Sequence, residues 1–151
     1  EIVQGDWSSR RVLFRSGGGY FTKFEQRITA AKTIIDFSDY NIVILFSLGI
    51  NDAISGTNVN TWKSGVATHF TNLRDEIGQG DVPIIMTEFQ GMGSGGTQYS
   101  SYNTAIQELA VAIPNVYSVD VTGAGLRDVN HWNYAGMKYV AGEMLDVAEN
   151  L

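Results

Sequence analysis

Apolar residues along the chain form two patterns, short continuous runs and stripes at helical spacing. The runs predict strands, which we place at 1–3, 41–48, 82–88 and 115–121. The run at 41–48, NIVILFSL, is almost uninterrupted, as expected for a strand buried on both faces. The stripes predict helices, which we place at 20–35, 59–78, 98–113 and 133–150.

Two of the predicted helices carry a clear apolar stripe, with residues recurring every three or four positions. In 59–78 the stripe is Trp62, Val66, Phe70, Leu73 and Ile77, and in 133–150 it is Ala135, Tyr139, Val140, Met144 and Val147. Strands that alternate with helices indicate an α/β fold whose parallel sheet is covered on both faces. Sites in such folds lie in loops at the carboxyl ends of the strands.

Composition narrows the class of protein. The chain has 151 residues, which fits a single domain over 1–151. Its net charge of -6 disfavours nucleic acid as a partner, because phosphate binding needs basic patches. No apolar run is long enough for membrane insertion, and the absence of cysteine excludes disulfides and thiolate chemistry. The oligomeric state and the compartment stay open, with a secreted or periplasmic location favoured over a cytoplasmic one.

Two loops contain candidate hydrogen-bond donors. In GIND, residues 49–52, Asn51 follows the predicted central strand, and its amide would suit a developing oxyanion. The alternative is an ordinary turn, which Gly, Asn and Asp all favour. In SGGG, residues 16–19, a glycine N–H could approach a ligand closely, although a flexible loop explains the same residues. The loop matches neither a dinucleotide motif nor a Walker motif, so a nucleotide-binding domain is a weaker interpretation.

One of the two histidines follows a carboxylate at a spacing of three. Asp128 precedes His131 in DVNH, just before the last predicted helix. Asp128 would accept a hydrogen bond from Nδ1 and leave Nε2 free to take a proton. The alternative is that Asp128 or Asn130 caps the helix and His131 is simply exposed. The second histidine, His69, borders the apolar stripe of 59–78 and is predicted to be a packing or surface residue rather than a ligand.

Taken in chain order, these motifs resemble the SGNH (GDSL-type) hydrolase family over nearly the whole chain. The strongest matches are GIND and DVNHWNYAG, where His131, Asn133 and Gly136 follow the family pattern. The resemblance implies a flavodoxin-like three-layer α/β/α sandwich and ester hydrolysis by a serine. It implies that Asp128 and His131 form the catalytic pair, and that Asn51 and Gly18 supply the oxyanion hole, with Gly17 or Gly19 as alternatives to Gly18.

The first block departs from this pattern. The family has Gly-Asp-Ser with serine as nucleophile, whereas this chain has Gly5-Asp6-Trp7 followed by Ser8 and Ser9. Three explanations remain: a serine missing after Asp6, a shifted turn that uses Ser8 or Ser9, or loss of catalysis with a retained binding cleft. Ser8 is the candidate nucleophile within the sequence as it stands.

The resemblance also bears on the substrate. Trp7 and Trp132 would flank the site, and aromatic rings suit the apolar faces of sugars. We therefore predict removal of a small acyl group, acetyl above all, from a carbohydrate or similar small-molecule ester, without cofactor or metal. The alternatives are an inactive carbohydrate-binding domain on the same fold and a lipase or lysophospholipase type of esterase.

Overall fold

The computed structural model describes residues 19–90 and 96–151, with side chains from 23 and from 99 onward. Its three strands are β1 (Ile44–Phe46), β2 (Ile84–Thr87) and β3 (Val116–Val119). The long helices are α1 (Gly19–Lys32), α3 (Val59–Ile77), α4 (Gly96–Ala112) and α5 (Tyr134–Glu149). The short helical elements are η1 (Phe37–Asp39) and α2 (Ile50–Ile54). The predicted strand at 1–3 lies outside the described residues.

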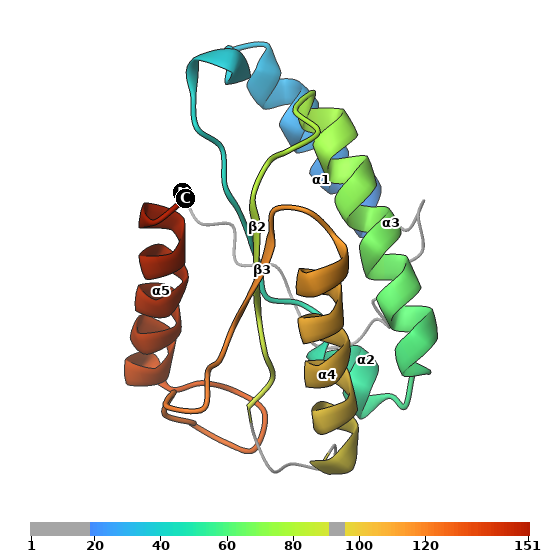
Figure 1. Ribbon diagram of the computed structural model, residues 1–151, viewed down its shortest axis with the longest axis vertical. Helices are drawn as coiled ribbons and strands as arrows, with labels where there is room; N and C mark the ends of the chain where they lie inside the picture. Colours follow the sequence, from blue (N-terminus) through green and yellow to red (C-terminus); the bar gives the residue numbers. More distant parts are fainter. Residues whose placement is uncertain (1–18, 91–95) are drawn as a thin grey trace.

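The strands form one parallel sheet in the order β1-β2-β3, with Ile44 opposite Ile84 and Ile85 opposite Tyr117. Helix α5 covers one face, while α3 and α4 cover the other and α1 packs on α3 (Figure 1). The predicted three-layer α/β/α sandwich with a parallel sheet is confirmed. Because the strands are parallel, all three end at the same edge, here called the carboxyl edge.

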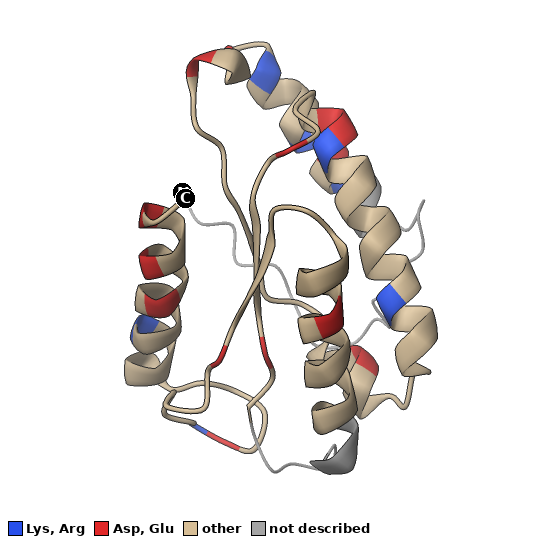
Figure 2. Cartoon of the chain, viewed as in Figure 1, with Lys and Arg blue, Asp and Glu red and all other residues tan. Residues whose placement is uncertain are grey.

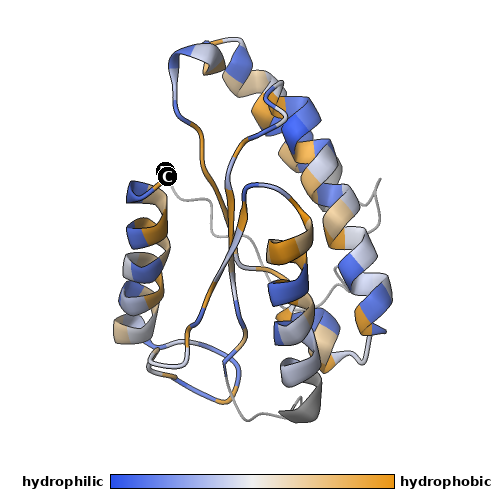
Figure 3. Cartoon of the chain, viewed as in Figure 1, coloured by the Kyte–Doolittle hydropathy of each residue, from blue (hydrophilic) through white to orange (hydrophobic). Residues whose placement is uncertain are grey.

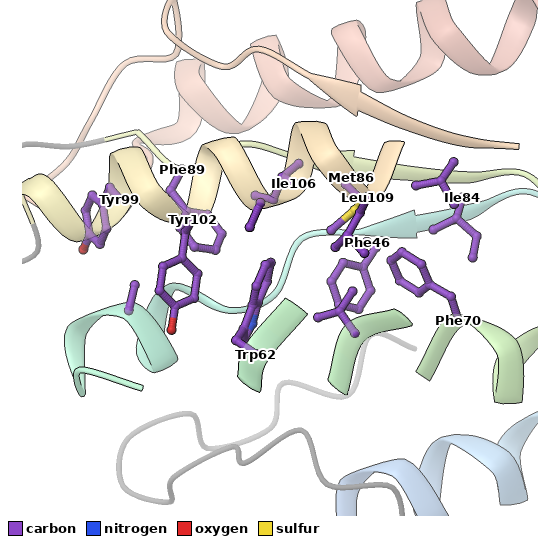
Figure 4. Close-up of a cluster of buried hydrophobic side chains, with 14 residues drawn as sticks. Phe46, Trp62, Phe70, Ile84, Met86, Phe89, Tyr99, Tyr102, Ile106 and Leu109 are labelled. Carbon is purple, nitrogen blue, oxygen red and sulfur yellow. The ribbon is translucent and has the colours of Figure 1, made fainter. Parts of the chain in front are cut away.

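Alternate residues of β2 point into different halves of the core. Ile84 and Met86 pack with aromatic side chains from α3 and α4, drawn in Figure 4, whereas Ile85 packs against Val140 and Met144 of α5. All four residues of β2 are buried, and the strands are among the most apolar parts of the chain (Figure 3).

We predicted that the strand within 41–48, which is β1, would be buried on both faces, but the strand buried on both faces is β2. Strand β1 covers only three of the eight residues from 41 to 48, and it lies at the edge of the described sheet. Leu45 is 53% exposed there, because α5, the helix on its face of the sheet, packs mainly against β2 and β3.

The helix predictions agree with the structure to within a few residues, with one correction in the last helix. All five stripe residues of α3 are buried, and the helix ends at Gly78 in the left-handed conformation that glycine favours. In α5 the buried residues are Gly136, Val140 and Met144. Ala135 and Tyr139 are exposed, because the sheet contacts a face rotated from the one that we predicted.

A buried arginine joins α3 to the amino ends of the strands. The Arg74 guanidinium donates hydrogen bonds to the carbonyls of Val82, Pro114 and Asn115. Apart from Asp52 in α2, the other described charged residues lie on helix surfaces and beyond the strand ends, and the strands themselves carry no charge (Figure 2). Among the described helices, none has the length and apolar character required to cross a membrane.

Candidate active site

The segment between β3 and α5 is a tight loop at the carboxyl edge. We call residues 126–132 the base loop. An antiparallel bridge between Leu126 and Trp132 closes it, and the Arg127 N–H donates to the His131 carbonyl at 2.8 Å. These backbone contacts bring the ends of the turn together, so that Asp128 and His131 face each other across it.

The predicted catalytic pair, Asp128 and His131, is in direct contact. His131 Nδ1 lies 2.8 Å from Asp128 Oδ1 and 3.0 Å from Oδ2. The Asn130 N–H and the His131 N–H each donate to Asp128 Oδ1 at 3.0 Å. These bonds lower the pKa of Asp128 to about 2. The bond from the Asn130 N–H has the largest effect, and the bond with the His131 ring has the next largest. Asp128 therefore stays ionised near neutral pH and selects the His131 tautomer with its proton on Nδ1.

The alternative role of Asp128 or Asn130 as a helix cap is wrong. Asn133 is the N-cap of α5, and its side-chain oxygen accepts the Gly136 N–H at 2.8 Å. The Asn133 side chain also donates to the Leu126 carbonyl, which fixes the base loop to the start of the helix. Gly136 is required because a Cβ there would collide with the Gly125 carbonyl oxygen.

The imidazole is open on its other side. The His131 side chain is 63% exposed, and Nε2 makes no hydrogen bond to another described residue. An Nε2 atom in this state is available to take a proton from a hydroxyl group brought close to it.

The proposed oxyanion donor lies on a separate segment. We call residues 49–57 the Asn51 turn, which follows β1 and contains α2. Asn51 is exposed in the first turn of this helix, and its amide bonds to no other described residue. Sequence analysis did not predict α2, in which residues 50–54 are helical where the alternative interpretation had an ordinary turn.

The Asn51 turn begins at a glycine that no other residue could replace without strain. Gly49 has φ +122°, and a Cβ there would stand 2.7 Å from atoms of the Trp62 indole. Trp62 is itself 2% exposed in the core between α3 and α4. The indole therefore supports the point from which α2 and Asn51 start.

Next to Asn51, Asp52 is a buried carboxylate that sequence analysis did not single out. It is 6% exposed, and Oδ2 has no hydrogen-bond partner in the described part of the chain. Oδ1 has one weak contact, at 3.5 Å from Thr57 Oγ1. Burial raises the pKa of Asp52 to about 6. The GIND motif contained this residue, but its burial depends on distant segments that pack around it.

The remaining predicted site residues have different outcomes. Ser8, Trp7 and Gly18 lie outside the described residues, so their positions relative to His131 stay predictions. Trp132, the last residue of the base loop, is half-buried and packs against the core on the α5 side of the sheet.

His69 is a packing residue, as predicted. Its ring lies 5.9 Å from the ring of Phe46, and burial lowers its pKa to about 4. His69 is therefore neutral near neutral pH.

A parallel α/β/α sandwich with an aspartate-held histidine at its carboxyl edge is the architecture of the SGNH hydrolases. A family model described as "Carbohydrate esterase, sialic acid-specific acetylesterase" matches residues 6–149. The chain belongs to this family, which confirms the resemblance found in the sequence. A search of curated proteins finds no match.

Two solved structures are similar to this chain in fold. A protein from Arabidopsis thaliana matches with a TM-score of 0.70 and 19% identity, covering 89% of this chain and 53% of that protein. A carbohydrate esterase family 3 protein from Talaromyces cellulolyticus matches with a TM-score of 0.56 and 18% identity, covering 72% and 59%. The chain thus spans between half and three fifths of the length of these structures.

Proposed function

We propose that this protein hydrolyses esters, removing a small acyl group such as acetyl from a carbohydrate. The observation that carries the proposal is the 2.8 Å contact between His131 Nδ1 and Asp128 at the carboxyl edge of the sheet. Membership of a carbohydrate esterase family supports the ester, the acyl group and the sugar.

In the proposed mechanism, His131 Nε2 takes the proton of a serine hydroxyl as the serine oxygen attacks the ester carbonyl. Asp128 stabilises the imidazolium while remaining ionised. His131 then returns the proton to the departing alcohol, which leaves an acyl-serine. Water attacks this intermediate, with His131 again accepting and returning the proton. Ser8 is the candidate nucleophile, because Asp6 is joined directly to Trp7 in the full sequence.

The negative oxygen of each tetrahedral intermediate would be stabilised by Asn51 and by the Gly18 N–H. The unpaired, exposed state of the Asn51 amide in the described structure supports this role for Asn51. Losing one such donor typically lowers turnover by about 10²- to 10³-fold. Trp132, at the end of the base loop, would contact the sugar or the acyl group together with Trp7.

The test compares the two histidines. We expect His131→Ala to abolish hydrolysis of p-nitrophenyl acetate and of an O-acetylated sugar, while His69→Gln retains activity in proportion to its folded fraction. Asn51→Ala should lower kcat more than it raises KM, because its contact strengthens in the transition state. Full activity of His131→Ala in the purified full chain would refute the proposal.

The nucleophile needs a separate test. A fluorophosphonate reagent should label one serine, and peptide mass spectrometry identifies it. We expect Ser8 to be labelled in wild-type protein and labelling to be lost in Ser8→Ala but kept in Ser9→Ala. Labelling of another serine would move the nucleophile without changing the role of His131.

A further inference from the structure

Helix α4 carries two buried tyrosines that hydrogen-bond to different functional loops. Tyr99 and Tyr102 are three residues apart, so they lie on neighbouring positions of one helix face. Figure 4 shows both rings projecting from the same side of α4. They are 3% and 2% exposed, respectively, and only their hydroxyl groups make polar contacts.

The first tyrosine reaches the base loop. The Tyr99 hydroxyl donates to Asn130 Oδ1 at 2.7 Å, across 31 residues of sequence. Asn130 stands next to His131, and its own N–H donates to Asp128 Oδ1. Tyr99 therefore holds the residue that links the two members of the Asp128–His131 pair.

The second tyrosine reaches the Asn51 turn. The Tyr102 hydroxyl donates to the Thr57 carbonyl at 2.9 Å, across 45 residues. The Thr57 N–H donates in turn to the Asp52 carbonyl at 3.0 Å, and Asp52 adjoins Asn51. Tyr102 therefore fixes the far end of the segment that carries the proposed oxyanion donor.

Both rings are held in place at the carboxyl edge itself. Phe89, two residues beyond β2, packs at ring-centroid distances of 6.0 Å from Tyr99 and 5.8 Å from Tyr102. The backbone of Phe89 is fixed to α4 by Asn103, whose side chain accepts its N–H and donates to its carbonyl. Burial raises the pKa of both tyrosines, that of Tyr102 to about 12, so both hydroxyls remain protonated donors.

We propose that Tyr99 and Tyr102 are positioning residues, which together set the placement of the base loop relative to the Asn51 turn. The inference rests on the proposed function, because it concerns the geometry of that same site. Neither tyrosine reacts. Each holds one loop on a common helix, so that the histidine and the oxyanion donor act on one ester group.

The experiment removes the hydroxyls and leaves the rings. Tyr99→Phe and Tyr102→Phe should each lower kcat about three- to ten-fold, as expected for one lost hydrogen bond, with little change in KM. Tyr117→Phe is the matched control, because the Tyr117 hydroxyl has no hydrogen-bond partner among the described residues, and it should leave kcat unchanged. Asn130→Ala should reproduce the loss of kcat in Tyr99→Phe. The double variant Tyr99→Phe with Asn130→Ala should be no slower than either of these single variants.

A measurement without catalysis separates this inference from the proposed function. In Tyr99→Phe the amides of Asn130 and His131 should exchange faster with deuterium, and in Tyr102→Phe the Thr57 amide should do so. Faster exchange together with reduced kcat supports the inference. If His131→Ala is inactive but both Phe variants keep wild-type kcat, the positioning role is wrong while the esterase stands. If wild-type protein hydrolyses no ester, the proposed function fails. Unchanged deuterium exchange in the Phe variants would overturn the inference that the two tyrosines hold these loops.

Discussion

Asp52→Asn should stabilise the fold increasingly as pH rises. The Asp52 carboxyl is buried, and burial raises its pKa from the ordinary value of 3.8 to about 6. The folded state therefore binds more protons at this group than the unfolded state does between these two values. Ionisation of Asp52 therefore lowers the stability of the fold as pH increases from about 4 to about 6. The stability contributed by the protonated carboxyl is fully retained only below the pKa that Asp52 has in the unfolded chain. Asparagine has nearly the same shape but no charge to bury.

The size of the effect follows from the shift. A difference of about two pKa units corresponds to about 3 kcal/mol, at about 1.4 kcal/mol per unit. Part of this is already present at about pH 4, so the stability gain of Asp52→Asn should grow by about 2–3 kcal/mol between about pH 4 and about pH 8. The amide group that replaces the Asp52 carboxyl lacks good hydrogen-bond partners, but its cost does not change with pH and so does not alter the pH dependence of the gain. His69 titrates alike in wild type and variant, so its contribution cancels.

Urea unfolding of wild type and variant at a series of pH values gives the difference directly. Asp120→Asn is the matched control, because the pKa of Asp120 is shifted in the opposite direction to that of Asp52. Hydrogen bonds from Thr122, chiefly from its hydroxyl, lower the pKa of the exposed Asp120. That contribution is present above the unfolded pKa and lost as pH falls through the folded one, so this variant should be less stable at neutral pH. A gain for Asp52→Asn that is flat with pH, or a loss that deepens above pH 6, would refute the reasoning.

Three further predictions concern the base loop and α5. Asp128→Asn should lower kcat by about 10²- to 10⁴-fold through the wrong His131 tautomer, with circular dichroism unchanged, and a variant of normal kcat would contradict the pairing. Gly136→Ala should destabilise the fold by about 1–3 kcal/mol in urea, because its Cβ meets the Gly125 carbonyl, and equal midpoints would refute the contact. Asn133→Ala should cost about 1 kcal/mol as a lost helix cap, measured in the same way, whereas the exposed Ala135→Ser should change stability less.

The fold could be predicted as far as local periodicity determines it. The stripe of 59–78 gave α3 correctly, because a helix that covers a sheet must repeat its apolar residues at that spacing. The five residues of α2 carry no such repeat and were missed. The exposure of Leu45 depends on which elements cover β1, which the sequence of that strand does not encode.

The candidate site, too, could be predicted only where neighbouring residues in the sequence determine it. The contact between Asp128 and His131 spans only three residues, so the local motif suggested it, and the resemblance to the SGNH family favoured it over a helix cap. The burial of Asp52 and the two tyrosine contacts join segments far apart in sequence. No local pattern marks these residues, since Tyr99 and Tyr102 are typical of any apolar helix face until their hydroxyl partners are known.

The contact between Gly136 and Gly125 also limits how the substrate range of this protein can be engineered. Both glycines lie where α5 meets the segment leading into the base loop, and a side chain at 136 would push that segment outward. The exposed side chain of Val129 is free of such crowding, whereas the Arg127 guanidinium lies 3.4 Å from Asp128 Oδ2. A mutant library intended to alter selectivity should therefore diversify 129 while keeping 125, 127 and 136 invariant, because the tolerance to change in this loop is concentrated at its tip.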